Sequence, residues 1–189
     1  MAIYYKDFLE YIIIPTLKSL KVNSSSAQIL LLGTASIESE ICTFLKQIKG
    51  NALGAYQCEP KTYKDIFDNY LNIILYDQEL RHRRDNLKYL FAKTCKLDIK
   101  FVKNGVVDDY HLFIVAPDPK RLMYDLKFST AIARIHYLRN PRPLPKWNDA
   151  EEMASYHKKY YNTSLGKTDL SKSIEIFKEI IDKCRNMII

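Results

Sequence analysis

Residues 24–48 read SSSAQILLLGTASIESEICTFLKQI, and this stretch decides the fold. Three serines suited to cap a helix precede Ala27, and apolar residues then recur with helical spacing as far as Ile48, just before Gly50 and Asn51. The spacing predicts a long central helix over about residues 27–48.

Glu38 lies on an apolar face of this expected helix. Its neighbours one and two turns away are uncharged: Leu31, Thr34, Cys42 and Leu45. Loss of hydration disfavours the ionised form of a carboxyl group, and a neutral carboxyl group can act as a general acid. Glu38 is therefore a candidate catalytic acid; the alternative is a structural Glu that accepts hydrogen bonds from a neighbouring loop.

Further helices and one small hairpin are expected on both sides of the central helix. An opening helix should be broken or kinked at Pro15, another helix should begin at Pro60, and a turn at Asn104-Gly105 should join two strands. The fold class expected is mainly α, with at most a small β-hairpin. The expected elements span residues 4–20, 27–48, 60–70, 77–95, 97–102, 111–115, 118–138, 149–161 and 170–187.

The composition is that of an ordinary folded protein. The chain has 189 residues, of which 47% are hydrophobic and 27% charged, so we expect a single domain over residues 1–189. No apolar run approaches the roughly 20 residues that a membrane helix needs. Asp7 and Glu10 in the first 20 residues argue against a cleaved secretory signal.

The charge and the metal-binding residue types set limits on ligands. A net charge of +7 favours a polyanionic partner such as nucleic acid, an anionic membrane surface or an acidic cell-wall polymer. The four cysteines form no CxxC pair and the four histidines no HxxxH pair, so neither a metal nor another cofactor is expected.

The residues that follow Glu38 carry a resemblance to a known family. They are Glu38-Ser39, then Gly54-Ala55-Tyr56-Gln57, then Pro60 and Thr62. In order and spacing this resembles the soluble lytic transglycosylase family of the lysozyme superfamily, in which Glu-Ser ends the catalytic helix and Gly-Leu-Met-Gln and Met-Pro-x-Thr follow. Ala55-Tyr56 and Glu59 depart from those motifs.

A later segment is similar to the same family's Tyr-Asn-Ala-Gly motif. It is Tyr161-Asn162-Thr163 with Gly166, and Thr163 and Ser164 depart from the family pattern. The phrases LLGTASIESE (31–40), ALGAYQCEPKTYKDIFDNYL (52–71) and AIARIHYLR (131–139) also resemble small phage-encoded, lysozyme-like proteins. The resemblance implies a lysozyme-like fold and cleavage of peptidoglycan.

The family's mechanism, carried over to this chain, uses one carboxyl group. Glu38 would protonate the glycosidic oxygen and then act as a base on the sugar's own 6-hydroxyl, while Tyr161 orients the acid. The expected substrate-binding residues are Ser39, Tyr56, Gln57, Thr62 and Asn162. Flat aromatic rings can cover the faces of sugars, so we place the rings of Tyr56 and Trp147 nearest the substrate. A hydrolytic lysozyme would instead need a second carboxylate, for which the candidates are Glu59, Asp65 and Asp68.

The function expected is a bacteriophage muramidase that acts on the glycan strands of the bacterial cell wall. It would work as an endolysin or as a virion-associated enzyme, made in the host cytoplasm before release or incorporation into the particle. Two alternatives stay open: a catalytically inactive lysozyme-like subunit that contacts other virion or tail proteins, and a basic nucleic-acid-binding domain. No nucleic-acid-binding motif supports the second alternative, so no specific nucleic acid is expected.

Overall fold

A computed structural model describes residues 3–103, 110–162 and 169–187. The protein is mainly α, with one two-stranded antiparallel sheet, as predicted. The first helical segment is continuous from Tyr5 to Ser19 and comprises α1 (Tyr5–Asp7), the π-helical turn η1 (Phe8–Ile13) and α2 (Ile14–Ser19).

Pro15 does not break this first helix, contrary to our expectation. Proline has no N–H to donate, and its ring crowds the preceding turn of a regular α-helix. The irregularity lies before Pro15, where the Ile14 N–H donates to the Leu9 carbonyl in a widened turn. The helix therefore continues past the proline.

The central helix α3 (Ser25–Ser39) is shorter than predicted. The Ser24 side chain accepts a hydrogen bond from the Ala27 N–H and caps the N-terminus, and residues 27–35 are all buried. Glu40, Ile41 and Cys42 then adopt left-handed conformations, with φ of 49°, 49° and 66°. The helix ends there, so the expected extension to Ile48 is wrong.

The remaining elements follow the sequence pattern closely. Asp77, Asp125, Asp149 and Asp169 each accept a hydrogen bond from a backbone N–H at the start of a helix. The helix expected over 118–138 is divided in two by Asp125. The elements are α4 (Pro60–Ile66), the π-turn η2 (Phe67–Leu71), α5 (Gln78–Cys95), α6 (Arg121–Tyr124), α7 (Leu126–Leu138), α8 (Ala150–Tyr160) and α9 (Leu170–Cys184).

The hairpin consists of β1 (Ile99–Lys103) and β2 (Tyr110–Ile114), with Phe101 paired opposite Leu112. The predicted turn at Asn104-Gly105 lies outside the described residues. Leu112 and Ile114 are buried, whereas all five residues of β1 are exposed. The hairpin thus covers the core with one strand and leaves the other in solvent.

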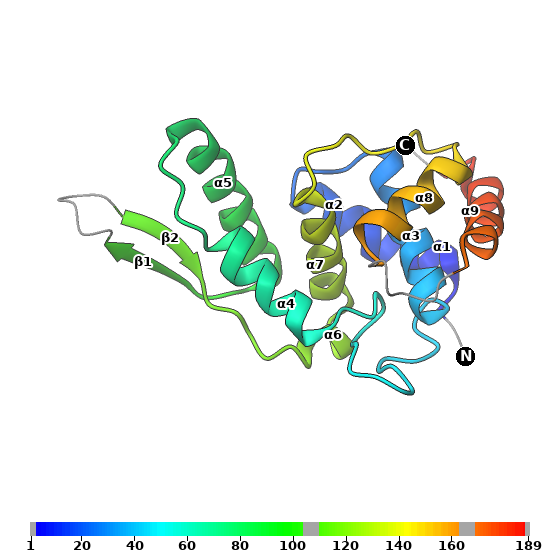
Figure 1. The fold of residues 1–189 in the computed structure, drawn as a ribbon, viewed down its shortest axis with the longest axis horizontal. Coiled ribbons are helices and arrows are strands. Elements are labelled where there is room, and N and C mark those ends of the chain that lie inside the picture. Colours follow the sequence, from blue (N-terminus) through cyan, green and yellow to red (C-terminus); the bar gives the residue numbers. More distant parts are fainter. Residues whose placement is uncertain (1–2, 104–109, 163–168, 188–189) are drawn as a thin grey trace.

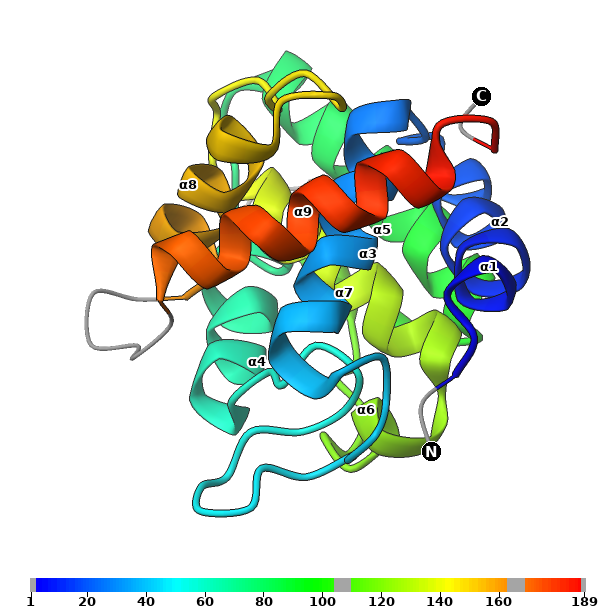
Figure 2. The same cartoon turned by 90° about the vertical axis from the view of Figure 1, so that its right-hand side faces the viewer.

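Two hydrophobic clusters form the core, and α7 belongs to both. One cluster surrounds α3 and includes Ala133 and Tyr137 of α7; the other surrounds α4 and α5 and includes Phe128 and Ile132 of α7. Figure 1 shows α7 between the α3, α8 and α9 side of the molecule and the α4, α5 and hairpin side. In Figure 2, α9 crosses over α3, on which it packs.

Within residues 3–103, 110–162 and 169–187, no helix is both long enough and apolar enough to cross a membrane. All four cysteines are free thiols.

Candidate functional site

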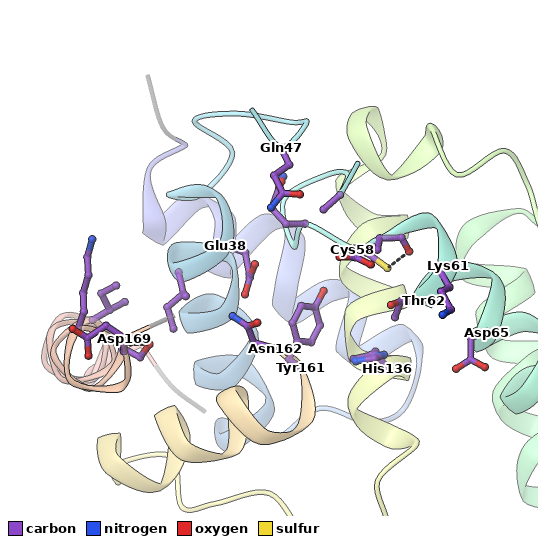
Figure 3. A pocket seen from close by; sticks show the side chains of 17 residues that line it. Glu38, Gln47, Cys58, Lys61, Thr62, Asp65, His136, Tyr161, Asn162 and Asp169 are labelled. Carbon is purple, nitrogen blue, oxygen red and sulfur yellow. Dashed lines mark hydrogen bonds between the residues drawn. The ribbon is translucent and has the colours of Figure 1, made fainter. Parts of the chain in front are cut away.

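A pocket of about 1030 Å³ lies where the C-terminal end of α3 meets the loop before α4 and the start of α9. Figure 3 shows Glu38 on one side of this pocket, with Thr62 and Asp65 of α4 on another. Gln57, Tyr161 and Asn162 also line it. The structure therefore brings together five predicted site residues: Glu38, Gln57, Thr62, Tyr161 and Asn162.

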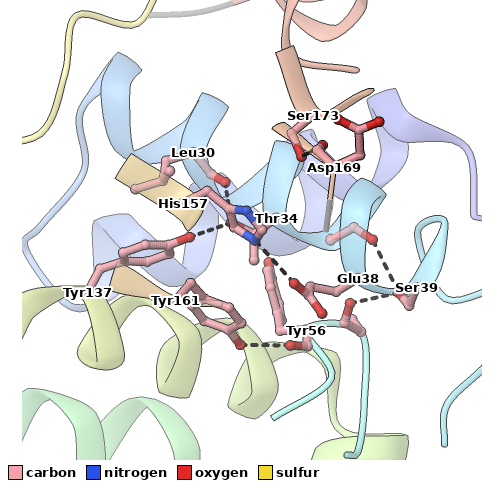
Figure 4. A network of polar contacts seen from close by, with 12 residues as sticks. Leu30, Thr34, Glu38, Ser39, Tyr56, Tyr137, His157, Tyr161, Asp169 and Ser173 are labelled. Carbon is pink, nitrogen blue, oxygen red and sulfur yellow. Dashed lines mark hydrogen bonds and ion pairs between the residues drawn. The ribbon is translucent and has the colours of Figure 1, made fainter. Parts of the chain in front are cut away.

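Glu38 occupies the last turn of α3 and is largely buried, with 17% of its side chain exposed to the pocket. Its Oε1 lies 3.2 Å from Nε2 of His157, which is fully buried on α8. Glu38 is thus held through Oε1 by His157, while part of its side chain stays open to a ligand in the pocket (Figure 4).

His157 is the functional-site residue that the sequence analysis missed. The uncharged neighbours expected for Glu38 included Cys42 and Leu45, but α3 ends before them and a histidine occupies the position beside the carboxylate. One signal was present: His157 precedes Tyr161 by four residues, so a helix through both places them on one face. A site that includes Tyr161 therefore also involves His157.

Tyr161 contributes its ring to the pocket and its hydroxyl to a backbone bond. Its Oη donates to the Tyr56 carbonyl at 2.8 Å, and its ring stacks on that of His157 with centroids 5.8 Å apart. Burial, together with nearby ionisable groups that include Glu38, holds the pKa of Tyr161 well above its usual value, so the phenol stays protonated. His157, rather than Tyr161, makes the direct contact with Glu38.

Ser39 binds the backbone of the following loop and does not line the pocket. The side chain is fully buried; its hydroxyl donates to the Ala55 carbonyl at 2.7 Å and accepts from the Cys42 N–H at 2.9 Å. These bonds tie residues 42 and 55 to the end of α3. The Ser39 hydroxyl therefore positions the loop and does not face a substrate, contrary to the expected role.

Gln57 lies at the turn of that loop. Its backbone is left-handed, with φ of 44°, and its Nε2 donates to the Gly54 carbonyl at 2.7 Å. Its Oε1 is buried and has no hydrogen-bond partner among the described residues. Unpaired buried polar atoms are rare in proteins, and this one belongs to a side chain that lines the pocket.

Tyr56 and Trp147 do not occupy the sugar-facing positions expected for them. The Tyr56 ring is 1% exposed, packs against Phe8 and bonds through its hydroxyl to Thr130 Oγ1 at 3.2 Å. Trp147 packs against the cluster around α3. Within the turn formed by residues 54–57, Gln57 faces the pocket while the Tyr56 ring enters the core.

The three candidate second carboxylates differ in their surroundings. Glu59 and Asp65 line the pocket, whereas Asp68 is exposed and pairs with Lys64. Asp65 accepts from Asn69 Nδ2 at 2.6 Å and forms an ion pair with Arg139. These partners hold its pKa below the usual value, the hydrogen bond from Asn69 contributing most. Asp65 is thus an ionised carboxylate with both oxygens engaged.

His136 lines the same pocket from α7 and forms a structural link. Its Nδ1 accepts from Arg139 at 3.4 Å, and burial together with the Arg139 charge lowers its pKa to about 4. The ring is therefore neutral at neutral pH.

We expect His136 to titrate far below an exposed histidine in an NMR titration of the ring protons. The ring of a histidine in an unstructured peptide titrates at about 6.5, and that of His136 should titrate at about 4. Because the unfolded chain binds this proton more readily, the contribution of His136 to the free energy of unfolding is complete above about pH 6.5 and is lost as the pH falls toward 4. A His136 midpoint that matches the value of the unstructured peptide would contradict the assignment.

The last part of the family resemblance falls only partly on described residues. Tyr161 and Asn162 line the pocket, whereas Thr163, Ser164 and Gly166 lie outside the described residues. Within residues 3–103, 110–162 and 169–187, no group of three or more His, Cys, Asp or Glu side chains is placed to hold a metal ion.

Comparisons of the chain with protein-family models, with curated proteins and with solved structures yield no match.

Proposed function

We propose that this protein is a bacteriophage peptidoglycan-cleaving muramidase of the lytic transglycosylase type, which cleaves the MurNAc–GlcNAc β-1,4 bond with Glu38 as acid and base. The observation that carries the proposal is the placement of Glu38. It is a mostly buried carboxylate that lines a large pocket, with Oε1 fixed by His157 and part of its side chain open to the pocket.

The reaction requires this kind of group. A glycosidic oxygen leaves readily only when it is protonated, because the sugar passes through an oxocarbenium-like transition state. The carboxyl group of Glu38 would donate that proton to the leaving oxygen. The resulting carboxylate would then accept the proton of the sugar's 6-hydroxyl as that oxygen bonds to C1 and closes a 1,6-anhydro ring.

The surroundings of the second carboxylates favour this intramolecular route over hydrolysis. A hydrolase needs a carboxylate free to activate water or to attack the sugar. Asp65 is engaged by Arg139 and Asn69, and Asp68 by Lys64. Glu59 remains as the candidate that a hydrolytic reaction would use.

The polar groups of the pocket suit N-acetylated sugars. Gln57, Thr62 and Asn162 offer amide and hydroxyl groups, which can donate to and accept from sugar hydroxyls and acetamido groups. The unpartnered Oε1 of Gln57 would gain a donor if a small shift of the side chain accompanied binding. These residues therefore fit the substrate-binding roles expected for them.

A structural subunit of a phage virion or tail is the second candidate, and the hairpin favours it. Phe101 is 68% exposed on β1, whose five residues are all exposed, and Tyr110 is 53% exposed at the start of β2. Exposed apolar side chains gathered on one element are typical of surfaces that bind other proteins. Persistence of the protein in purified virions, without cleavage of peptidoglycan, would support this candidate.

Mass spectrometry of soluble fragments released from purified peptidoglycan tests the proposal. We expect 1,6-anhydro-muramyl ends. Reducing ends would indicate a hydrolase and direct attention to Glu59 as the second carboxylate. No release by protein shown to be folded would favour the structural subunit.

A further inference from the structure

His157 is a fully buried histidine whose ring contacts Glu38. Its Nε2 lies 3.2 Å from Glu38 Oε1, while its Nδ1 is buried and has no hydrogen-bond partner among the described residues. A histidine ring has two neutral tautomers and one charged form, and these three states differ in which buried ring nitrogen, donor or acceptor, is left without a hydrogen bond.

Two of those states place a proton on Nδ1. If Glu38 were protonated and donated to Nε2, the neutral ring would carry its proton on Nδ1; an imidazolium would carry a proton on both nitrogens. Either state buries an N–H without an acceptor, which costs free energy comparable to a lost hydrogen bond. The neutral ring with its proton on Nε2 leaves only an unpaired acceptor.

We propose that His157 carries its single ring proton on Nε2, donates it to the ionised carboxylate of Glu38, and thereby sets both the orientation and the protonation range of that group. His157 is then a positioning residue. The consequence for catalysis rests on the proposed function, whereas the tautomer and the contact do not.

The groups around the pair are consistent with one fixed arrangement. Tyr161 stacks on the His157 ring, and Tyr137 donates its hydroxyl to Thr34 Oγ1 at 2.7 Å, since Thr34 itself donates to the Leu30 carbonyl. Titratable or charged side chains from every neighbouring element face the pair or line the pocket beside it. They are Lys61 and Asp65 on α4, His136 and Tyr137 on α7, Tyr161 after α8, Asp169 and Lys172 at the start of α9, and Tyr56, Cys58 and Glu59 in the loop.

The contact has a definite effect on a reaction that needs protonated Glu38. A donor to the carboxylate stabilises its ionised form, so it moves the alkaline limb of the pH–rate profile to lower pH. Replacing His157 by Leu removes the donor, and we expect the alkaline limb to move up by about one pH unit. His157→Gln keeps an amide N–H that can reach the same oxygen, so its limb should stay near that of the wild type.

The first experiment reads the tautomer of the wild-type protein directly. Long-range ¹H–¹⁵N correlation of the histidine rings at neutral pH should show His157 protonated on Nε2 alone. A proton on Nδ1, or on both nitrogens, would overturn the proposal. This readout needs no activity and no substitution.

The second experiment compares pH–rate profiles of wild type, His157→Gln and His157→Leu, with His82→Gln on the exposed face of α5 as the matched control. A shifted alkaline limb in the Leu variant, with the Gln variant and the control unshifted, supports the proposal. Unchanged limbs in all variants overturn it. If His157→Leu does not fold, the tautomer of the wild type and the pH–rate profile of His157→Gln test the proposal.

A wild-type protein that carries the proton on Nε2 but does not cleave peptidoglycan would contradict the proposed function. The assignment of the His157 tautomer would remain supported.

Discussion

Glu38→Gln is expected to release soluble fragments from purified peptidoglycan about 10²- to 10⁴-fold more slowly than the wild-type protein. The amide cannot give a proton to the glycosidic oxygen or take one from the 6-hydroxyl. Its Oε1 can still accept from His157 Nε2, where the carboxylate oxygen lies 3.2 Å away. The loss should therefore appear in the rate and not in the fold, which circular dichroism and a urea melt would verify.

Glu40→Gln is the matched control for this substitution. Glu40 lies two residues beyond Glu38, is exposed, and caps α3 in a left-handed conformation that glutamine adopts at similar cost. We expect the control to keep the wild-type rate. Equal rates for Glu38→Gln and the wild type would remove Glu38 from the mechanism.

Gly54→Ala is expected to lower the free energy of unfolding by about 2 to 4 kcal/mol. Gly54 has φ of +78°, and a Cβ there would lie 2.2 Å from the carbonyl oxygen of Leu122. The obstacle is backbone, so it cannot rotate aside. Because the Gly54 carbonyl also accepts from Gln57, displacement of this loop should lower activity as well.

Gly50→Ala is the control for Gly54→Ala. It distinguishes the clash with the Leu122 carbonyl from a general effect of replacing glycine by alanine. The atoms nearest to a Cβ at residue 50 all belong to the flexible side chain of Gln47, which can move away. Urea denaturation should give this variant a free energy of unfolding within about 0.5 kcal/mol of the wild type. A Gly54→Ala midpoint equal to that of Gly50→Ala would show that the loop tolerates a Cβ at residue 54.

Local signals predicted most of the helices. Ser24 caps α3 and Pro60 begins α4, as the sequence indicated, because capping and first-turn preferences depend on residues a few positions apart. The contact between Glu38 and His157 joins residues 119 positions apart in the chain. Helical periodicity contains no information about such a pair, so the sequence singled out Glu38 but not its partner His157.

The end of α3 shows why apolar periodicity failed there. Ile41, Leu45 and Ile48 continue the helical pattern, yet Ser39 offers its hydroxyl to the Cys42 N–H, a bond that competes with the helical one. Leu45 and Ile48 are 40% and 83% exposed, so burial of these side chains does not stabilise a helical continuation. The same bond lets the chain turn back toward residue 55 and carry Gln57 to the pocket.

The membership of α7 in both hydrophobic clusters has a consequence for cooperativity. Glu38 belongs to the side of the molecule built on one cluster, and Thr62 to the side built on the other, so the pocket exists only while both pack on α7. Amide protons of α7 should therefore exchange with solvent only through global opening, whereas those of the exposed strand β1 that lack ladder partners exchange early. The arrangement of the pocket residues should therefore be lost in the same unfolding transition as the rest of the fold.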